Sequence, residues 1–334
     1  MPLRPERGDC CVEELDSLEV SDIHSVFEAI NHSNTTQKSE VQDWSELRGR
    51  VCSNVRRLRL GGVMKSTKLK QTLRQGGMVF GCMLSATAST RWAGALSGST
   101  LDYVIIDTEH SSRDRTEIQT LCSMLRQVDI APVVRVPIPK KEWVAMALDA
   151  GASGILVPYV ETIEEVEAVT ATARWHPMKG EYLMRAVRDN KFPSPSAKKY
   201  LKDRHKGTFV ILGIESEPAY NNLDAILDAG KPDGIFIGPN DMSTSLGVPN
   251  EYDNPVYLDV VADIIRRCEE RAIPVMVHQQ NIPDSTTAIE LGARFVLHST
   301  DTGILQRAIK TEMNRLREIS GVAVSGSKDG VSVV

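Results

Sequence analysis

The sequence has few aromatic residues and no dense block of basic ones. Aromatic side chains make up 5% of the 334 residues, and 39 lysines and arginines stand against 44 aspartates and glutamates, for a formal net charge of -5. Nucleic-acid-binding proteins instead gather lysine and arginine on one surface and often stack bases on aromatic rings. The composition therefore disfavours nucleic acid as a partner and favours a small-molecule ligand.

Long apolar runs and patterned cysteines are also missing. No stretch reaches the roughly 20 apolar residues that cross a membrane, and the polar N-terminus lacks the apolar core of a secretion signal. The six cysteines have neither the spacing of a zinc site nor the density of a disulfide scaffold. We therefore expect reduced thiols, no membrane partner and a cytoplasmic protein.

The remaining composition, 41% apolar and 25% charged, is that of a globular protein. Residues 1–65 are charged, rich in Ser and Asn and only weakly periodic, which predicts a partly helical or flexible N-terminal extension. Residues 66–320 are numerous enough for one large α/β barrel, and 321–334 are expected to form a flexible tail. The predicted organisation is one catalytic domain between two appended segments.

From Met78 onward, short apolar runs alternate with longer amphipathic stretches. Several runs are rich in Val or Ile, as buried parallel strands prefer, and the alternation is typical of strand–helix units. Eight such runs occur, namely Met78–Leu84, Tyr103–Asp107, Pro132–Val136, Gly154–Pro158, Phe209–Glu215, Gly234–Gly238, Ile273–His278 and Arg294–Ser299. Eight parallel strands predict a closed (β/α)8 TIM barrel, with helices over Ser112–Val128, Lys140–Asp149, Thr162–Trp175, Val256–Arg271 and Gly303–Leu316.

One connection is unusually long, because roughly fifty residues separate the fourth run from the fifth. It holds a predicted helix and then a second part containing Pro193 and Pro195. We expect this second part to cross the mouth of the barrel and to shape the substrate pocket.

Two carboxylates follow neighbouring runs at the point where each run stops. Glu215 comes after Phe209-Val-Ile-Leu-Gly-Ile, and Asp241 after Gly234-Ile-Phe-Ile-Gly-Pro-Asn. The carboxyl ends of barrel strands meet at the face that carries the active site. Oxygen ligands suit Mg²⁺ best, with Mn²⁺ or Co²⁺ as alternatives. The pair predicts a divalent-metal site, although either residue alone is more often a helix cap or a loop carboxylate.

Further polar residues lie near these strand ends. An arginine within a buried run is costly without an anion, so Arg135 either clamps an anionic ligand or pairs with Glu109. Asp107 can fix the tautomer of His110, whose imidazole can then move a proton near neutral pH; a purely structural histidine is the alternative. Loop amides around Gly238 can hold a carboxylate if a turn or helix opens there. Together these groups suit an oxo acid.

Several motifs in order resemble the HpcH/HpaI aldolase family, which includes hydroxy-oxo-acid aldolases and macrophomate synthase. They are Ile106-Asp-Thr-Glu-His110, Val134-Arg-Val-Pro137, Leu148-Asp-Ala-Gly-Ala152, Leu156-Val-Pro158, Gly213-Ile-Glu215 and Gly234-Ile-Phe-Ile-Gly-Pro-Asn-Asp-Met-Ser243. The match runs from about Leu69 to about Leu316, and the motifs together are far more specific than any one of them.

The resemblance implies a metal-dependent barrel that makes pyruvate enolate and usually assembles as a hexamer. By position, it implies that Glu215 and Asp241 bind the metal. It also implies that His110 with Asp107 transfers a proton and that Arg135 clamps the 2-oxo group.

The resemblance extends to loop and subunit-contact positions, with some departures. Gly238 and Asn240 match positions whose backbone contacts the substrate carboxylate, and Asp149 matches an acid close to a subunit contact. The family usually has a Gln two places before the metal-binding Glu, where this chain has Gly213. This departure leaves the residues matched to pyruvate binding in place and leaves the identity of the partner substrate open.

The predicted function is a metal-dependent carbon–carbon lyase acting on a 2-oxo acid. Retro-aldol cleavage of a 4-hydroxy-2-oxo acid and decarboxylation of oxaloacetate both leave pyruvate enolate. No lysine ends a strand among the motif positions, which disfavours a Schiff-base aldolase. Two alternatives are a biosynthetic enzyme resembling macrophomate synthase, which traps the enolate with a larger acceptor, and a catalytically silent scaffold. We expect a homo-oligomer.

Overall fold

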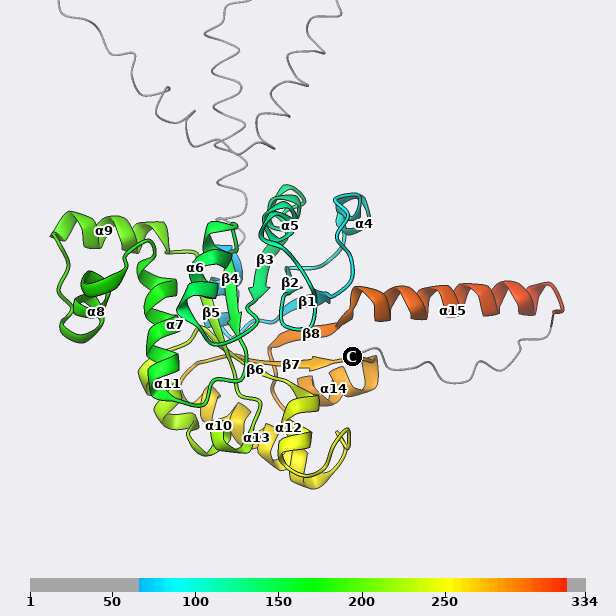
Figure 1. Ribbon diagram of the computed structural model, residues 1–334. Coiled ribbons are helices and arrows are strands. Elements are labelled where there is room, and N and C mark those ends of the chain that lie inside the picture. The colour runs from blue at the N-terminus through cyan, green and yellow to red at the C-terminus, as the bar shows by residue number, and fades with distance from the viewer. Residues whose placement is uncertain (1–65, 323–334) are drawn as a thin grey trace, which may run out of the picture. The chain divides into compact units, whose positions relative to one another are not determined.

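The computed structural model describes residues 66–322, which form a closed barrel of eight parallel strands (Figure 1). Each strand pairs with the next one in sequence, and β8 closes the ring against β1. The strands are β1 Val79–Leu84, β2 Tyr103–Asp107, β3 Ala131–Arg135, β4 Gly154–Val157, β5 Phe209–Gly213, β6 Gly234–Ile237, β7 Val275–Gln279 and β8 Phe295–Thr300. The predicted (β/α)8 barrel is confirmed. The predicted extension over 1–65 lies outside the described residues, as do residues 323–334 of the predicted tail.

Helices connect the strands. They are α4 Trp92–Leu96, α5 Arg115–Gln127, α6 Lys141–Asp149, α7 Ile163–Trp175, α8 Gly180–Asp189, α9 Pro195–Arg204, α10 Glu217–Asn221, α11 Leu223–Gly230, α12 Pro239–Ser245, α13 Pro255–Glu269, α14 Ile282–Glu290 and α15 Asp301–Ile319. Local sequence explains their starts: the Asp114 side chain accepts from the Glu117 amide, and Thr162 with Glu165 forms a capping box. The five predicted helices are confirmed within three residues at each end.

Strand side chains alternate between two apolar cores. In β5, Phe209 and Ile211 belong to the core inside the barrel, whereas Val210 and Leu212 belong to the layer between strands and helices. Successive side chains of a strand point to opposite faces, so every second residue faces the barrel interior. This alternation decides which residues face the barrel interior and which face the surrounding helices.

The long connection after β4 does not cross the mouth. It forms α8 and α9, which pack beside α7 (Figure 1). Helix α7 returns toward the amino ends of the strands, and His176 at its end is tied to His205, which follows α9. The chain then enters β5 at its amino end, where the carbonyl of Thr208 accepts from Lys70. The predicted excursion over the mouth is therefore wrong, because the segment starts and ends at the opposite face.

Two helices mark the ends of the described chain. A helix over 66–74 inserts Leu69 and Leu73 into the inner core and so closes the amino end of the barrel. At the other end of the sequence, α15 projects sideways from the barrel (Figure 1), and Asp301 is its buried residue. Within residues 66–322, no helix is both long and apolar enough to cross a membrane.

Candidate active site

The period of two brings three of the predicted site residues to the carboxyl end of the barrel interior. Asp107 follows the inward-facing Tyr103 and Ile105 of β2 and pairs in register with Arg135 of β3. Glu215 continues the inward set of β5 beyond Gly213, because the Ile214 amide still bonds to the carbonyl of Phe236 on β6. The strand pattern, rather than a loop, therefore positions these three charged groups.

Arg135 is buried between two acids of the β2 end. Its Nε lies 2.7 Å from Oδ1 of Asp107, and its Nη1 lies 3.0 Å from Oε2 of Glu109. Burial alone lowers the pKa of Arg135, but the hydrogen bond and charge of Asp107, together with Glu109 and Glu215, raise it. Nη2 lies 3.7 Å from the sulfur of Met83, a weak acceptor, and so retains donor capacity for a ligand oxygen. Pairing with Glu109 and clamping a ligand are thus compatible.

Asp107 accepts a hydrogen bond from Arg135 rather than from His110. Burial raises the pKa of Asp107, but the Arg135 hydrogen bond and charge, helped by the Glu109 amide, outweigh it and lower the pKa. Among the described residues, no hydrogen bond joins Asp107 to His110. The His110 ring is half exposed, and its Nε2 lies 3.8 Å from Oε2 of Glu109. The histidine that we expect to move a proton therefore has Glu109 as its neighbour.

Glu215 and Asp241 converge over Gly238. A β-carbon placed on Gly238 would lie 2.8 Å from Oε2 of Glu215 and 3.2 Å from Oδ2 of Asp241. Asp241 lies in the first turn of α12, whose N-cap is Gly238, so the glycine connects the β6 end to the helix carrying the second acid. The missing side chain of Gly238 creates the space in which both carboxylates meet.

The electrostatics of this space favour a cation. Burial raises the pKa of Glu215 to about 8, and the charges of Glu109 and Asp241 add to the shift, whereas the Tyr159 amide and Arg135 oppose it. Among residues 66–322, no group of three His, Cys, Asp or Glu side chains is placed to hold a metal ion. A pair of carboxylates still fits Mg²⁺, which commonly takes one or two protein carboxylates and completes its shell with water and substrate oxygens.

The loop positions Gly238 and Asn240 are both at this site. Gly238 is buried, and Asn240 is exposed on the first turn of α12. The Tyr252 hydroxyl donates to Oδ1 of Asn240, so that side chain is already engaged. What Asn240 can offer a ligand is therefore chiefly its backbone.

Two residues outside the predicted set, Glu109 and His278, lie beside it in the structure. Burial raises the pKa of Glu109 to about 7; Asp107 and Asp241 raise it further, and Arg135 opposes them. Burial lowers the pKa of His278 to about 4, with Arg135 contributing, so its ring is neutral beside the cluster. His278 shares the inward parity of Met276 in β7. Counting every second residue along each strand is the sequence signal that would have found it.

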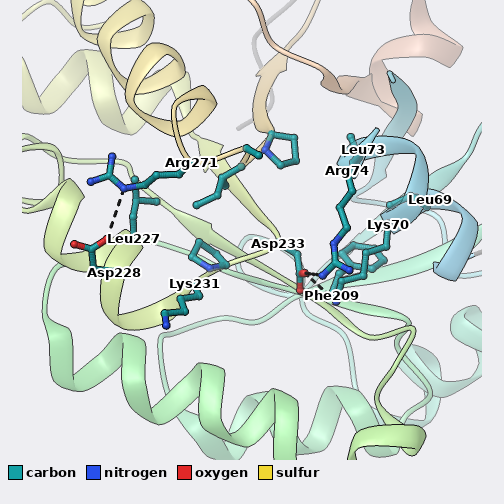
Figure 2. Close-up of a pocket in the computed structure, with 14 residues that line it drawn as sticks. Leu69, Lys70, Leu73, Arg74, Phe209, Leu227, Asp228, Lys231, Asp233 and Arg271 are labelled. Carbon is teal, nitrogen blue, oxygen red and sulfur yellow. Dashed lines mark ion pairs between the residues drawn. The ribbon is translucent and has the colours of Figure 1, made fainter. Parts of the chain in front are cut away.

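A cavity of about 300 Å³ lies at the opposite, amino end of the barrel (Figure 2). Helix 66–74, the start of β5, part of α11 and the segments that lead into β6 and β7 line it. Its charges are largely paired: Asp233 faces Lys70 and Arg74, and Asp228 faces Arg271. Active sites of this fold lie at the carboxyl face, so we assign the chemistry to the Glu215 and Asp241 end.

Comparisons with known proteins find relatives of this chain. Residues 81–308 match the family model of HpcH/HpaI aldolase/citrate lyase. The hydroxypyruvate/pyruvate aldolase of Roseobacter denitrificans is 30% identical over 244 residues, which cover 71% of this chain and 91% of the relative. A 4-hydroxy-2-oxo-heptane-1,7-dioate aldolase of Salmonella paratyphi C is 30% identical over 247 residues, which cover 71% and 90%.

Solved structures of this family are similar to the barrel described above. The HpcH/HpaI aldolase from Desulfitobacterium hafniense DCB-2 superposes with a TM-score of 0.65 at 25% identity, covering 77% of this chain and 99% of that one. The family match spans more than half of the sequence and includes every strand from Gly81 of β1 to β8. The protein therefore belongs to the HpcH/HpaI aldolase/citrate lyase family of enzymes.

Proposed function

We propose that the protein is a divalent-metal-dependent carbon–carbon lyase that generates pyruvate enolate. The substrates are 4-hydroxy-2-oxo acids, by retro-aldol cleavage, and oxaloacetate, by decarboxylation. The observation that carries the proposal is the convergence of Glu215 and Asp241 over Gly238, within electrostatic range of the buried Arg135. Relatives named as aldolases of hydroxypyruvate, pyruvate and a 4-hydroxy-2-oxo acid support the substrate class.

The metal would be held by Glu215 and Asp241, with Mg²⁺ the expected ion and Mn²⁺ or Co²⁺ as alternatives. When bound, it supplies Lewis-acid stabilisation of the charge that develops on the 2-oxo oxygen. Arg135 would add a fixed positive charge at the same oxygen through Nη2, while Asp107 and Glu109 hold its other nitrogens. Backbone amides at Gly238 and Asn240 would orient the substrate carboxylate.

Proton transfer distinguishes the two reactions. In retro-aldol cleavage the C3–C4 bond breaks, its electrons pass to C3, and the C4 hydroxyl gives up its proton as the aldehyde forms. His110 would accept this proton, with Glu109 as its neighbour at 3.8 Å. Decarboxylation of oxaloacetate releases CO₂ without removing a proton from the substrate, so we expect it to depend less on His110. In both cases the enolate is protonated at C3 to give pyruvate.

Metal titration with matched variants tests the proposal. We expect the wild type to release pyruvate from oxaloacetate with Mg²⁺ and to lose this activity in EDTA. Glu215→Gln and Asp241→Asn should each lower turnover by about 100-fold or more and abolish heat of Mg²⁺ binding in calorimetry. Asp228→Asn, at the amino-end cavity, is the matched control. Undiminished turnover after thorough metal removal, or in both carboxylate variants, would overturn the proposal.

The alternative reactions receive less support. The macrophomate-synthase-like alternative had two grounds, a long segment over the mouth and the departures from the family motifs. The first is lost, because that segment packs beside α7 instead. A Schiff-base reaction needs a desolvated lysine, and no lysine among residues 66–322 is buried. A silent scaffold would not need the charged cluster around Arg135. Oxaloacetate given together with candidate acceptors separates capture from simple release, because capture alone yields a product larger than pyruvate.

We also propose that the protein is a homo-oligomer in which α15 contacts a second copy. This helix exposes an apolar stripe that its own barrel does not cover: Ile304, Leu305, Ile309, Met313, Leu316 and Ile319. On the barrel, Phe80 of β1 is 45% exposed although it lies in a strand of a closed sheet. A helix of 19 residues is about 28 Å long. If each copy packed its α15 on the barrel of the other, the contact would bury on the order of 1,000 Å², about the minimum expected of a biological interface. The hexamer stays a prediction.

A further inference from the structure

Tyr159 lies at the mouth of the barrel in a backbone conformation that is unusual for its residue type. It follows the end of β4, and its φ of 34° is in the left-handed region that aromatic residues rarely adopt. Its flanking residues are well buried, but the Tyr159 ring is 37% exposed and belongs to neither core cluster. Core packing therefore does not explain why a tyrosine occupies this position.

The backbone of Tyr159 is held by one of the proposed metal ligands. Its amide donates to Oε1 of Glu215 at 3.1 Å. Gly213 makes this contact possible, since a β-carbon there would lie 2.1 Å from Oε1 of Glu215 and 3.0 Å from the Tyr159 nitrogen. The glycine that stands where the family usually has Gln thus lets Glu215 and the Tyr159 backbone come together.

The side chain of Tyr159 is fixed at the rim. Its hydroxyl donates to the carbonyl of Pro137, after β3, at 3.2 Å. Burial raises the pKa of the phenol, and the charges of Glu109, Glu165 and Glu215 raise it further, so the hydroxyl keeps its proton. With its proton committed to Pro137, the phenolic oxygen presents lone pairs to whatever occupies the mouth.

We propose that Tyr159 is a specificity-determining residue that contacts the substituent at C4 of the substrate, which is the aldehyde part, and favours neutral hydroxylated aldehydes. This inference rests on the proposed lyase function. A phenolic oxygen whose proton is already engaged accepts a hydrogen bond from a hydroxyl group, and Glu215, which binds the Tyr159 amide, repels a second carboxylate. An aliphatic substituent of equal size would leave the phenolic oxygen without that partner, which costs affinity.

The reverse reaction tests this preference. Pyruvate loses a C3 proton, its C3 forms a bond to the aldehyde carbon, and the aldehyde oxygen takes up a proton. We would measure kcat/KM for glyceraldehyde, butyraldehyde and succinate semialdehyde with pyruvate and Mg²⁺, each normalised to the same variant's rate of deuterium exchange at pyruvate C3. For the wild type we expect glyceraldehyde to exceed both other aldehydes.

Two variants separate the hydroxyl from the ring. Tyr159→Phe removes only the hydroxyl and should lower the glyceraldehyde-to-butyraldehyde ratio about 3- to 10-fold. Tyr159→Gly keeps the amide to Glu215, tolerates a positive φ, and should lower the ratio at least as far while admitting bulkier aldehydes. Tyr182→Phe, on exposed α8, is the matched control.

The outcomes are distinct for this inference and for the proposed function. A normalised ratio that is unchanged in both variants, or a wild type that prefers butyraldehyde or succinate semialdehyde, overturns the role of Tyr159. Loss of exchange and of all aldehyde reactions by one common factor also overturns it, because Tyr159 would then act only through Glu215. Absence of deuterium exchange in the wild type with Mg²⁺ would instead overturn the lyase function itself.

Discussion

Nε of Arg135 lies 2.7 Å from Oδ1 of Asp107, its direct neighbour in the β2–β3 register. The ion pair is buried and spans two strands, so it fixes the guanidinium against the barrel wall. Its second acid, Glu109, comes from the loop that follows β2. The arginine is thereby oriented before any ligand arrives.

Removing Asp107 should cost both stability and turnover. Asp107→Asn leaves Arg135 buried with weaker compensation, and breaking a buried pair typically costs about 3–5 kcal/mol. We expect a lower Tm and a fall in oxaloacetate turnover of about 100-fold. Asp114→Asn, which changes an exposed cap to a similarly good one, is the control for thermal unfolding. Wild-type turnover in Asp107→Asn would show that the orientation of Arg135 is not needed.

Adding a methyl group at Gly238 should expel the metal. In Gly238→Ala the new β-carbon would meet both Glu215 and Asp241, so the carboxylates must separate. We expect Mg²⁺ affinity, measured by calorimetry, to fall at least about 10-fold, as for other changes that displace ligands. Gly94→Ala is the matched control, because its β-carbon would meet nothing within 4 Å. Equal Mg²⁺ affinity in both variants would contradict the placement of the site.

The metal-free protein should lose stability as the pH rises. The pKa of Glu215 is raised from an ordinary value near 4.5 to about 8, so the folded state favours the protonated acid. Its stabilisation is complete below the unfolded pKa and is lost as the pH rises through about 8. In EDTA we expect the Tm at pH 9 to be lower than at pH 6 by on the order of 5 °C. Saturating Mg²⁺ should reverse the trend, and Glu215→Gln should weaken it to the part that Glu109 contributes, since the pKa of that acid is also raised, to about 7. A Tm that rises with pH in EDTA would contradict the assignment.

Charging the apolar stripe of α15 should dissociate the oligomer. Ile309→Asp together with Met313→Asp places two carboxylates in the face expected to contact the second copy. We expect light scattering after gel filtration to report a smaller species than the wild type. Lys310→Asp changes charge on the opposite side of the same helix and should keep the wild-type mass. A monomeric wild type would rule out the contact of α15 with a second copy, and so would an unchanged mass in the double variant.

The sequence predicted the strands well because buried parallel strands are short, apolar and β-branched, as in Phe209–Gly213. It predicted that Glu215 and Asp241 belong together because both follow strands. It could not predict that Asp107 faces Arg135 and not His110, since that depends on side-chain direction after the strand ends. The course of α8 and α9 was misjudged because sequence spacing does not say at which face a connection closes. His278 was not predicted because no motif includes it, although strand parity places it inward.

The period of two in β5 separates chemistry from packing along one strand. Phe209, Ile211, Gly213 and Glu215 face inward, whereas Val210, Leu212 and Ile214 pack against the helices. Deleting a single residue from this strand would exchange the two sets and drive a carboxylate into the apolar layer. Conversely, a combinatorial library confined to the inward positions could reshape the catalytic lining while the outer layer keeps the domain folded.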